Sequence, residues 1–287
     1  MGSYRIFLDL SADLDLEFAK ENNIGFIPMI YSIDEKEYIS TDFLNDEKLK
    51  EFYDKMLNDS ITKTSQITPF QYIEYLDQFA KKGENILYFT LSSGLSNTYN
   101  SALLAKEELC DKYKDFKFEV VDSLAATGGI GVLCHIAIEN QKKGMTIEEN
   151  AEAMRNITKN IKHWFYVEDL KYLKRGGRVT ASKAFIANAL NIKPVMIVNK
   201  EGKLEAVGKK LGIKRCQQWI VEKFIESFDN TSNIVYICHA LSYDAVHFLK
   251  KKLLEFNPNL EIHVTTICPV IGCHSGPGTV TVCHIGK

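Results

Sequence analysis

Apolar segments typical of β-strands alternate with amphipathic helical segments through the first half of the chain, and this alternation constrains the fold more than any other feature. Asn85–Leu91 is almost wholly apolar, as expected of a strand buried inside a parallel sheet. A polar loop, Ser92–Thr98, follows it, then a helical segment, Tyr99–Tyr113, and another strand, Phe116–Val121. This β-α-β-α order predicts an α/β fold with a mostly parallel sheet and helices on both of its faces.

The pattern changes in the second half, where hairpins are mixed with helices. Lys193–Val198 and Lys203–Lys209 flank a turn at Asn199–Gly202, which predicts a β-hairpin. A chain of 287 residues is longer than one hydrophobic core usually organises. We therefore expect an N-terminal α/β domain at residues 1–162 and a second domain, of α+β type, at residues 163–287.

Local patterns predict the backbone at several further places. Ile24–Ile33 is expected to be one strand that turns into a hairpin, and Ile61–Thr68 a polar loop. Thr68-Pro69-Phe70-Gln71 is expected to open a helix with a capping box. Gly272–Gly278 is expected to be a rigid glycine loop that carries His274.

Small and hydroxyl residues gather in segments that suit a ligand. Ligands of parallel sheets lie at the carboxyl ends of the strands, which here points to Ser92–Thr98 and Asp122–Gly131. Thr62–Gln66 also precedes a helix N-terminus, where an anion is favoured. The alternative is that these hydroxyls only cap helices.

Two basic groups have a similar pair of interpretations. His274 could donate a hydrogen bond to a carboxylate or act as an acid or base, or it could be a surface histidine beside a turn. Arg175 and Arg178 flank a Gly-Gly pair at a helix end. They could serve the helix dipole, or they could grip a phosphate or an acidic partner surface.

Several classes of protein are disfavoured by composition and by the lack of motifs. Lys and Arg number 35 against 37 Asp and Glu, so nucleic acid is not expected as a partner. No transmembrane segment is expected. An odd count of 7 Cys, with scattered spacing and no export signal, favours reduced thiols and a cytoplasmic location. No nucleotide-binding glycine motif and no hydrolase elbow occurs. No Cys-x-x-Cys pair occurs either, and His239, His247 and His263 lack metal-ligand spacing, so no metal is expected.

Taken together, the motifs resemble those of the DegV family. They follow one another in order along nearly the whole chain: Thr64-Ser65-Gln66, Ser92–Ser96, Val121-Asp122-Ser123, Leu170–Arg178 and His274–Gly278. The resemblance implies a two-domain α/β protein with a fatty acid between the domains. It also implies the binding subunit of a bacterial fatty-acid kinase, which presents the bound carboxylate to a separate ATP-dependent subunit and carries the acyl phosphate.

The same resemblance implies roles for particular residues. The fatty acid, such as palmitate, stearate or oleate, would be bound by Thr64, Ser65, Ser93, Gly94, Ser96, His274, Ser275 and Gly276. Arg175 and Arg178 would meet the kinase subunit. No catalytic residue and no cofactor is implied, so the chain is expected to be a carrier and not an enzyme. The chain departs from the family pattern at Leu10, Asn97 and Leu211.

The physics of an acyl chain agrees with a carrier. Each buried methylene contributes about 0.8 kcal/mol, so a long tail supplies about ten kcal/mol before the entropy of binding is counted. Two alternatives remain. One is an acyl hydrolase or transferase that uses Ser96 or Ser123 with His274, and the other is a binding protein for another small anion, such as a phosphorylated sugar.

Overall fold

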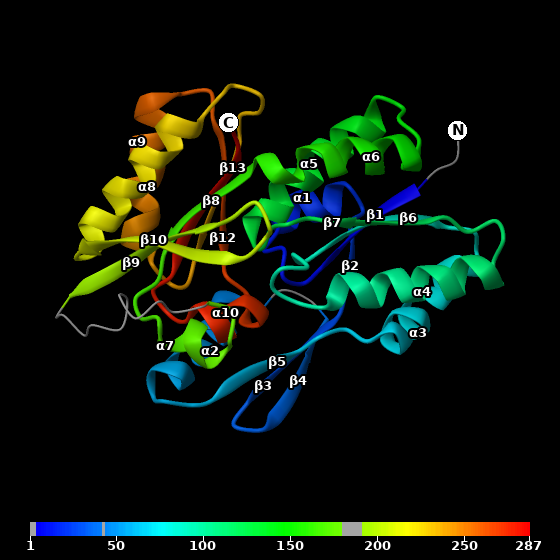
Figure 1. The fold of residues 1–287 in the computed structure, drawn as a ribbon, viewed down its shortest axis with the longest axis horizontal. Helices are drawn as coiled ribbons and strands as arrows, with labels where there is room; N and C mark the ends of the chain where they lie inside the picture. Colours follow the sequence, from blue (N-terminus) through cyan, green and yellow to red (C-terminus); the bar gives the residue numbers. More distant parts are fainter. Residues whose placement is uncertain (1–3, 42–43, 180–190) are drawn as a thin grey trace.

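The computed structural model of the protein describes residues 4–41, 44–179 and 191–287. Its first sheet has four parallel strands in the order β2-β1-β6-β7. The strands are β1 (Tyr4–Asp9), β2 (Gly25–Ile27), β6 (Asn85–Thr90) and β7 (Phe118–Asp122). One face is covered by α3 (Pro69–Ala80) and α4 (Thr98–Lys112), and the other by α5 (Gly128–Lys142) and α6 (Ile147–Ile157), as Figure 1 shows. The expected parallel sheet with helices on both faces is confirmed.

Alternating side chains of the strands point into two hydrophobic cores, one on each face of the sheet. On β1, Ile6 and Leu8 pack into the core beneath α5 and α6. Phe7 points to the opposite face, because successive residues of a strand do, and its ring meets Phe79 of α3 edge to face at 5.2 Å. The sheet is therefore buried on both sides, as its apolar strands require.

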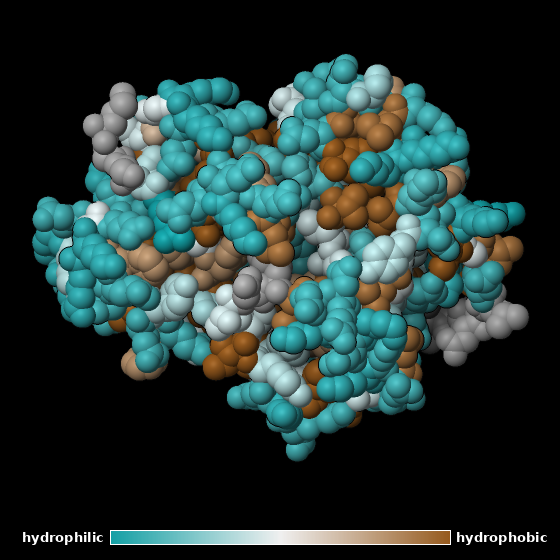
Figure 2. All heavy atoms as spheres, turned by 180° about the vertical axis from the view of Figure 1, so that it is seen from behind, coloured by the Kyte–Doolittle hydropathy of each residue, from teal (hydrophilic) through white to brown (hydrophobic). Residues whose placement is uncertain are grey.

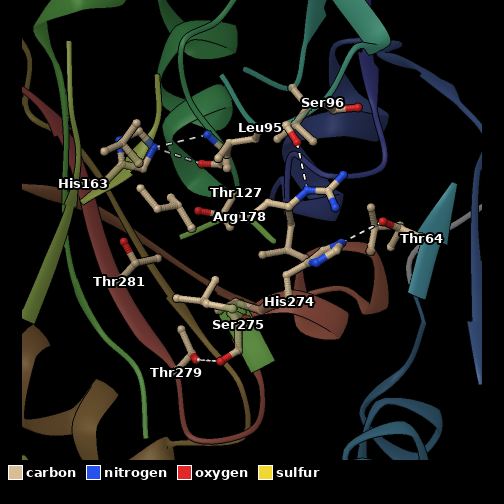
Figure 3. Close-up of a pocket in the computed structure, with 18 of the residues that line it drawn as sticks. Thr64, Leu95, Ser96, Thr127, His163, Arg178, His274, Ser275, Thr279 and Thr281 are labelled. Carbon is tan, nitrogen blue, oxygen red and sulfur yellow. Dashed lines mark hydrogen bonds between the residues drawn. The ribbon is translucent and has the colours of Figure 1, made fainter. Parts of the chain in front are cut away.

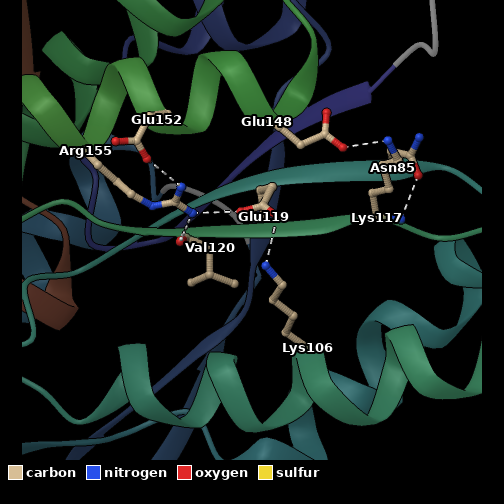
Figure 4. A network of polar contacts seen from close by, with 8 residues as sticks. All are labelled: Asn85, Lys106, Lys117, Glu119, Val120, Glu148, Glu152 and Arg155. Carbon is tan, nitrogen blue, oxygen red and sulfur yellow. Dashed lines mark hydrogen bonds and ion pairs between the residues drawn. The ribbon is translucent and has the colours of Figure 1, made fainter.

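A polar network joins strand β7 to the helices on both sides of the sheet (Figure 4). Glu119 of β7 accepts hydrogen bonds from Lys106 of α4 at 2.9 Å and from Arg155 of α6 at 2.7 Å. Burial alone would raise the pKa of the Glu119 carboxyl, but the two cations outweigh it and lower that pKa. The ionised carboxylate thus holds both helical layers to one edge strand.

The second sheet is mixed and has six strands in the order β10-β9-β8-β13-β11-β12. Among the described strands of this sheet, β11 and β12 pair parallel and the other pairs are antiparallel. The strands are β8 (Ile161–Tyr166), β9 (Ile192–Val198), β10 (Leu204–Leu211), β11 (Ile234–His239), β12 (Glu261–Thr266) and β13 (Val280–Ile285). Helices α8 (Ile213–Ser227) and α9 (Tyr243–Phe256) cover one face, and the mixture confirms the expected α+β character.

The core beneath α5 and α6 is shared by the first and second sheets. Helix α5 packs against β11 and β13 of the second sheet as well as against β1 of the first. Tyr236 and Cys283 of the second sheet accordingly belong to the same buried cluster as Leu8 and Ile130. The domain boundary near residue 162 stays a prediction, and the halves on either side of it are called the N-terminal and C-terminal halves below.

A small third sheet differs from the sequence prediction. It has the order β4-β3-β5 and comprises β3 (Met29–Ile33), β4 (Lys36–Ser40) and β5 (Thr62–Ser65). The single strand expected at Ile24–Ile33 is wrong, because the chain leaves the first sheet after β2, at Pro28, and enters this one. The loop expected at Ile61–Thr68 is also wrong in part, since β5 pairs antiparallel with β3.

Four further helices complete the described part of the fold. They are α1 (Leu16–Glu21), α2 (Asp46–Leu57), α7 (Lys171–Arg175) and α10 (Pro269–Ser275), with a 3-10 turn at Thr158–Asn160. The capping box at Thr68 is confirmed. The rigid glycine loop expected to carry His274 is wrong, because His274 lies in the last turn of α10, which begins at Pro269 and is capped by Gly276.

The surface is mainly hydrophilic. On the face opposite to that of Figure 1, hydrophobic patches lie among polar side chains, and the outline is notched between the two halves (Figure 2). In the part of the chain that the structure describes, no helix is both long and apolar enough to cross a membrane.

Candidate binding cavity

A cavity lies between the two halves of the molecule and draws its walls from both. It encloses about 830 Å³ of space free of atoms, counting its open part. Most of the lining is apolar, and it includes Met29, Leu91, Leu95, Phe165, Val198 and Ile271. A mainly apolar lining with a few polar groups is typical of a site for a small hydrophobic molecule.

Five of the predicted ligand residues line this cavity. They are Thr64 and Ser65 at the end of β5, Ser96 in the loop after β6, and His274 and Ser275 at the end of α10. The structure brings together segments from opposite ends of the chain, because α10 packs directly against β5. Figure 3 shows Ser96, Thr64, His274 and Arg178 on one side of the cavity.

The link between the two segments is a hydrogen bond. The Thr64 hydroxyl and His274 Nε2 lie 2.7 Å apart. Thr62, also on β5, donates to the carbonyl of Cys273 at 3.3 Å and accepts from Arg175 Nη2 at 3.2 Å. Strand β5 therefore fixes the ends of α10 and α7 against each other.

His274 has no charge at neutral pH in this environment. Burial lowers the pKa of its imidazole to about 4, and the guanidinium groups of Arg178 and Arg175 act in the same direction. Its Nδ1 faces Gly176, and no hydrogen bond to it is present within the described residues. The imidazole can thus donate or accept a hydrogen bond at the cavity but brings no positive charge.

A second, open cavity adjoins the first. It encloses about 1630 Å³, counting the open side, and its lining includes Ser93, Gly94 and Lys203. Ser96 and Arg178 line both cavities. The predicted residues Ser93 and Gly94 thus lie at the outer cavity and not at the apolar one.

Gly276 is outside the linings of both cavities as the described residues define them. It has a φ of 79°, and a Cβ there would come within 2.2 Å of the Tyr172 ring. The position therefore requires glycine for a close contact between α10 and α7.

The two arginines differ in position. Arg178 is exposed, donates from Nε to the carbonyl of Leu95 at 3.1 Å, and lies at the junction of the two cavities. Arg175 is exposed at the end of α7. Arg178 thus lines the cavity itself, whereas the sequence analysis expected it only at a contact with a partner. The partner role of both arginines stays a prediction.

The serines considered as nucleophiles are engaged elsewhere. The Ser96 hydroxyl is 2.7 Å from that of Thr98, whereas His274 bonds to Thr64. Ser123 is buried and hydrogen-bonds the backbone of Ala125 through both its donor and its acceptor. An activated nucleophile needs a base within hydrogen-bond reach, and this arrangement does not supply one to either serine.

The sequence analysis did not name four of the polar lining residues individually: Thr127, His163, Thr279 and Thr281. Figure 3 places His163 and Thr281 on the side away from Thr64. Burial lowers the pKa of His163 to about 4, so this imidazole is also neutral at pH 7. Thr127 lies in Asp122–Gly131, one of the segments expected to hold a ligand because it follows the carboxyl end of a parallel strand. His163 and Thr281 lie on strands, and nothing in the sequence around them distinguishes them from other strand residues.

Comparisons with known proteins agree with this geometry. Residues 3–287 match a family model described as uncharacterised protein, DegV family. A DegV domain-containing protein from Clostridium perfringens is 35% identical over 291 residues, covering 100% of this chain and 98% of the relative.

Two solved structures are also similar. A hypothetical protein from Thermotoga maritima, described as revealing a fatty acid binding function, is 28% identical, with 100% of each chain covered and a TM-score of 0.85. The Streptococcus pneumoniae Fatty Acid Kinase (Fak) B3 protein, loaded with linoleic acid, is 19% identical, with 100% of each chain covered and a TM-score of 0.84. At that identity the second similarity concerns the fold alone.

Proposed function

The chain belongs to the DegV family, and we propose that it binds one long-chain fatty acid in the cavity between its halves and presents the carboxylate to a partner. The observation that carries this proposal is the chemistry of the cavity. An apolar lining from both halves meets a group of hydroxyl, imidazole and guanidinium side chains on one side.

The apolar lining suits the acyl tail. Leu91, Leu95, Phe165 and Val198 remove the tail from water, and each buried methylene contributes about 0.8 kcal/mol. The tail therefore supplies most of the affinity.

The polar group suits the carboxylate. Thr64 and Ser96 offer hydroxyl donors, His274 offers a neutral imidazole, and Arg178 supplies the positive charge. A hydrogen bond to a charged group contributes about 1.5–3 kcal/mol. These side chains bind and orient the head, and the chain needs no nucleophile or cofactor of its own to do so.

The open outer cavity supports the role of a carrier. Arg178 lines both cavities, so the carboxylate would lie at the boundary between the buried site and the surface. A similar fold belongs to a protein whose name includes fatty acid kinase. We propose that a separate kinase subunit docks here, with Arg175 and Arg178 in the contact, and that the chain carries the acyl phosphate and is not itself an enzyme.

Free thiols support a reducing compartment. Among the described residues, Cys110 is partly buried and the other cysteines are buried, all as free thiols. Such thiols persist in the cytoplasm, which we propose as the location of the protein.

Delipidated protein titrated with palmitate, stearate and oleate tests the proposal. Saturable uptake of about one fatty acid per chain is expected, with no comparable uptake of a phosphorylated sugar and no hydrolysis of an acyl ester. Uptake of the sugar phosphate alone would favour the small-anion alternative. Steady turnover of the ester, lost in Ser96→Ala, would favour the hydrolase.

A further inference from the structure

A cluster of imidazole and carboxylate groups lies outside the cavity, where α1 and α5 meet β12. His263 and Glu261 are two residues apart on β12 and so share a face of the strand, and His135 reaches them from α5. One potential ligand atom from each of the three lies within 4.8 Å of the other two. Asp15, the N-cap of α1, adds a carboxylate oxygen 3.5 Å from His263 Nδ1.

The two imidazoles are held in place by aromatic neighbours. The ring of His135 stacks on Phe18, with centroids 3.6 Å apart and planes within 12°. Its Nε2 shares a hydrogen bond of 3.0 Å with the Tyr236 hydroxyl, and His263 stacks on the Tyr236 ring at 5.0 Å. A hydrogen bond that orients an imidazole is the usual support for a metal-binding histidine.

Carboxylates lie beside the imidazoles of this cluster. Glu261 Oε1 is 3.0 Å from His263 Nε2. Asp15 and Glu261 bring the negative charge that offsets a divalent ion. Two imidazole nitrogens and one carboxylate oxygen, with a water in the fourth position, form a donor set that zinc accepts.

We propose that His135, His263 and Glu261 form a binding site for a divalent transition metal such as Zn²⁺, with Asp15 accepting a hydrogen bond from Nδ1 of His263 and so orienting its Nε2 toward the ion. Ligand atoms about 2.0–2.2 Å from a tetrahedral zinc are roughly 3.3 Å apart, so the cluster must contract around the ion. Glu261 is exposed and its side chain can move to do so. Since α1 and α5 belong to the N-terminal half and β12 to the C-terminal half, the metal would link the two halves.

Sequence spacing could not reveal this site. The nearest histidine or cysteine to His263 in the sequence is Cys268, which is not part of the cluster, and the neighbour Glu261 alone is a weak signal. The third ligand, His135, comes from α5, and the supporting carboxylate of Asp15 comes from the cap of α1, and the fold brings both to β12.

Calorimetric titration of chelator-treated protein with Zn²⁺ tests the proposal. We expect one zinc per chain, and a loss of affinity of about tenfold or more in His135→Gln, in His263→Gln and in Glu261→Gln. His247→Gln, an exposed histidine of α9, is the matched control and should bind like the unchanged protein. Zinc at roughly a hundredfold above its Kd should raise the unfolding midpoint by about 5 °C.

Two controls keep the outcome clear. Glu261 is exposed, so Glu261→Gln remains folded and informative even if the substitution of buried His135 disturbs folding. The absorption spectrum of the Co²⁺ form distinguishes nitrogen and oxygen ligands from thiolates and should lack a thiolate charge-transfer band. Absence of stoichiometric zinc binding, binding unaffected by all three substitutions, or a thiolate spectrum would each overturn the proposal.

Discussion

At the scale of the residue, the charge state of His274 decides how the cavity can hold an anion. Its pKa of about 4 leaves the imidazole neutral at pH 7, because burial and the two arginines disfavour the protonated form. The attraction for a carboxylate must then come from Arg178 and from hydrogen-bond donors such as Thr64, whose hydroxyl is 2.7 Å from His274 Nε2. The head group would be held mainly by directional hydrogen bonds.

Substitution of these donors should weaken fatty-acid binding without unfolding the protein. Thr64→Val, Ser96→Ala and His274→Ala each remove one hydrogen bond to a charged group, so we expect the Kd for oleate to rise about ten- to a hundredfold. Ser123→Ala is the control, because that hydroxyl bonds only to the Ala125 backbone and does not line the cavity. Titration of the delipidated variants measures the effect, and unchanged affinity in all three would place the head group elsewhere.

Several residues of the candidate site could be predicted from the sequence, and the others could not for a physical reason. Thr64, Ser96 and His274 stood in motifs of small and hydroxyl residues, and all three line the cavity. His163 and Thr281 lie inside strands. Alternation along a strand shows which residues share a face but not which face meets a cavity.

At the scale of the element, the site depends on the junction of β5, α7 and α10. The sequence did not reveal β5 or α10. A polar strand of four residues forms only by pairing with β3, and a helix of seven residues that is followed by glycines has weak local signals. Gly176 closes the junction, since its missing Cβ leaves room for the His274 ring. The contact between α7 and α10 thus sets the orientation of that ring.

Two adjacent glycines allow this contact to be tested with a matched control. In Gly176→Ala the new Cβ would lie 2.2 Å from His274 Nδ1, so the ring must move away from Thr64, and we expect oleate affinity to fall about tenfold or more. Gly177 has a φ of +68° and open space around it. Gly177→Ala should therefore cost about 1 kcal/mol of stability through backbone strain while affinity is kept.

Thermal unfolding of the two variants measures the loss of stability from backbone strain. Oleate titration measures the loss of affinity from displacement of the His274 imidazole. Equal affinity in Gly176→Ala and Gly177→Ala would mean that the position of His274 does not control binding.

At the scale of the whole molecule, the strand and helix alternation was sufficient to predict the parallel sheet with helices on both faces. Its signals are local to each segment, and the first sheet follows them. The third sheet and the joint between the halves depend on contacts between segments far apart, such as β5 with α10, and local patterns carry no information about these. The cavity lies where the two halves meet. The sequence therefore showed the motifs that line it, but it could not show the shape of the cavity.

The proposed docking of a kinase is also a property of the assembled molecule. Arg175 is exposed on α7 and is not among the residues that line the cavity. Arg175→Ala should keep oleate uptake but reduce acyl-phosphate formation with a kinase subunit and ATP, and higher protein concentration should recover part of the loss. Arg215→Ala, an exposed arginine on α8, is the matched control. Equal loss of uptake and phosphorylation would instead assign Arg175 to the ligand.

The most direct test of the central claim is the identity of whatever fills the cavity in the purified protein. Extraction of the native protein with organic solvent, followed by mass spectrometry, should give long-chain fatty acids such as palmitate, stearate or oleate at about one per chain. An extract without acyl chains, from protein that also fails to take up added oleate after delipidation, would contradict the account.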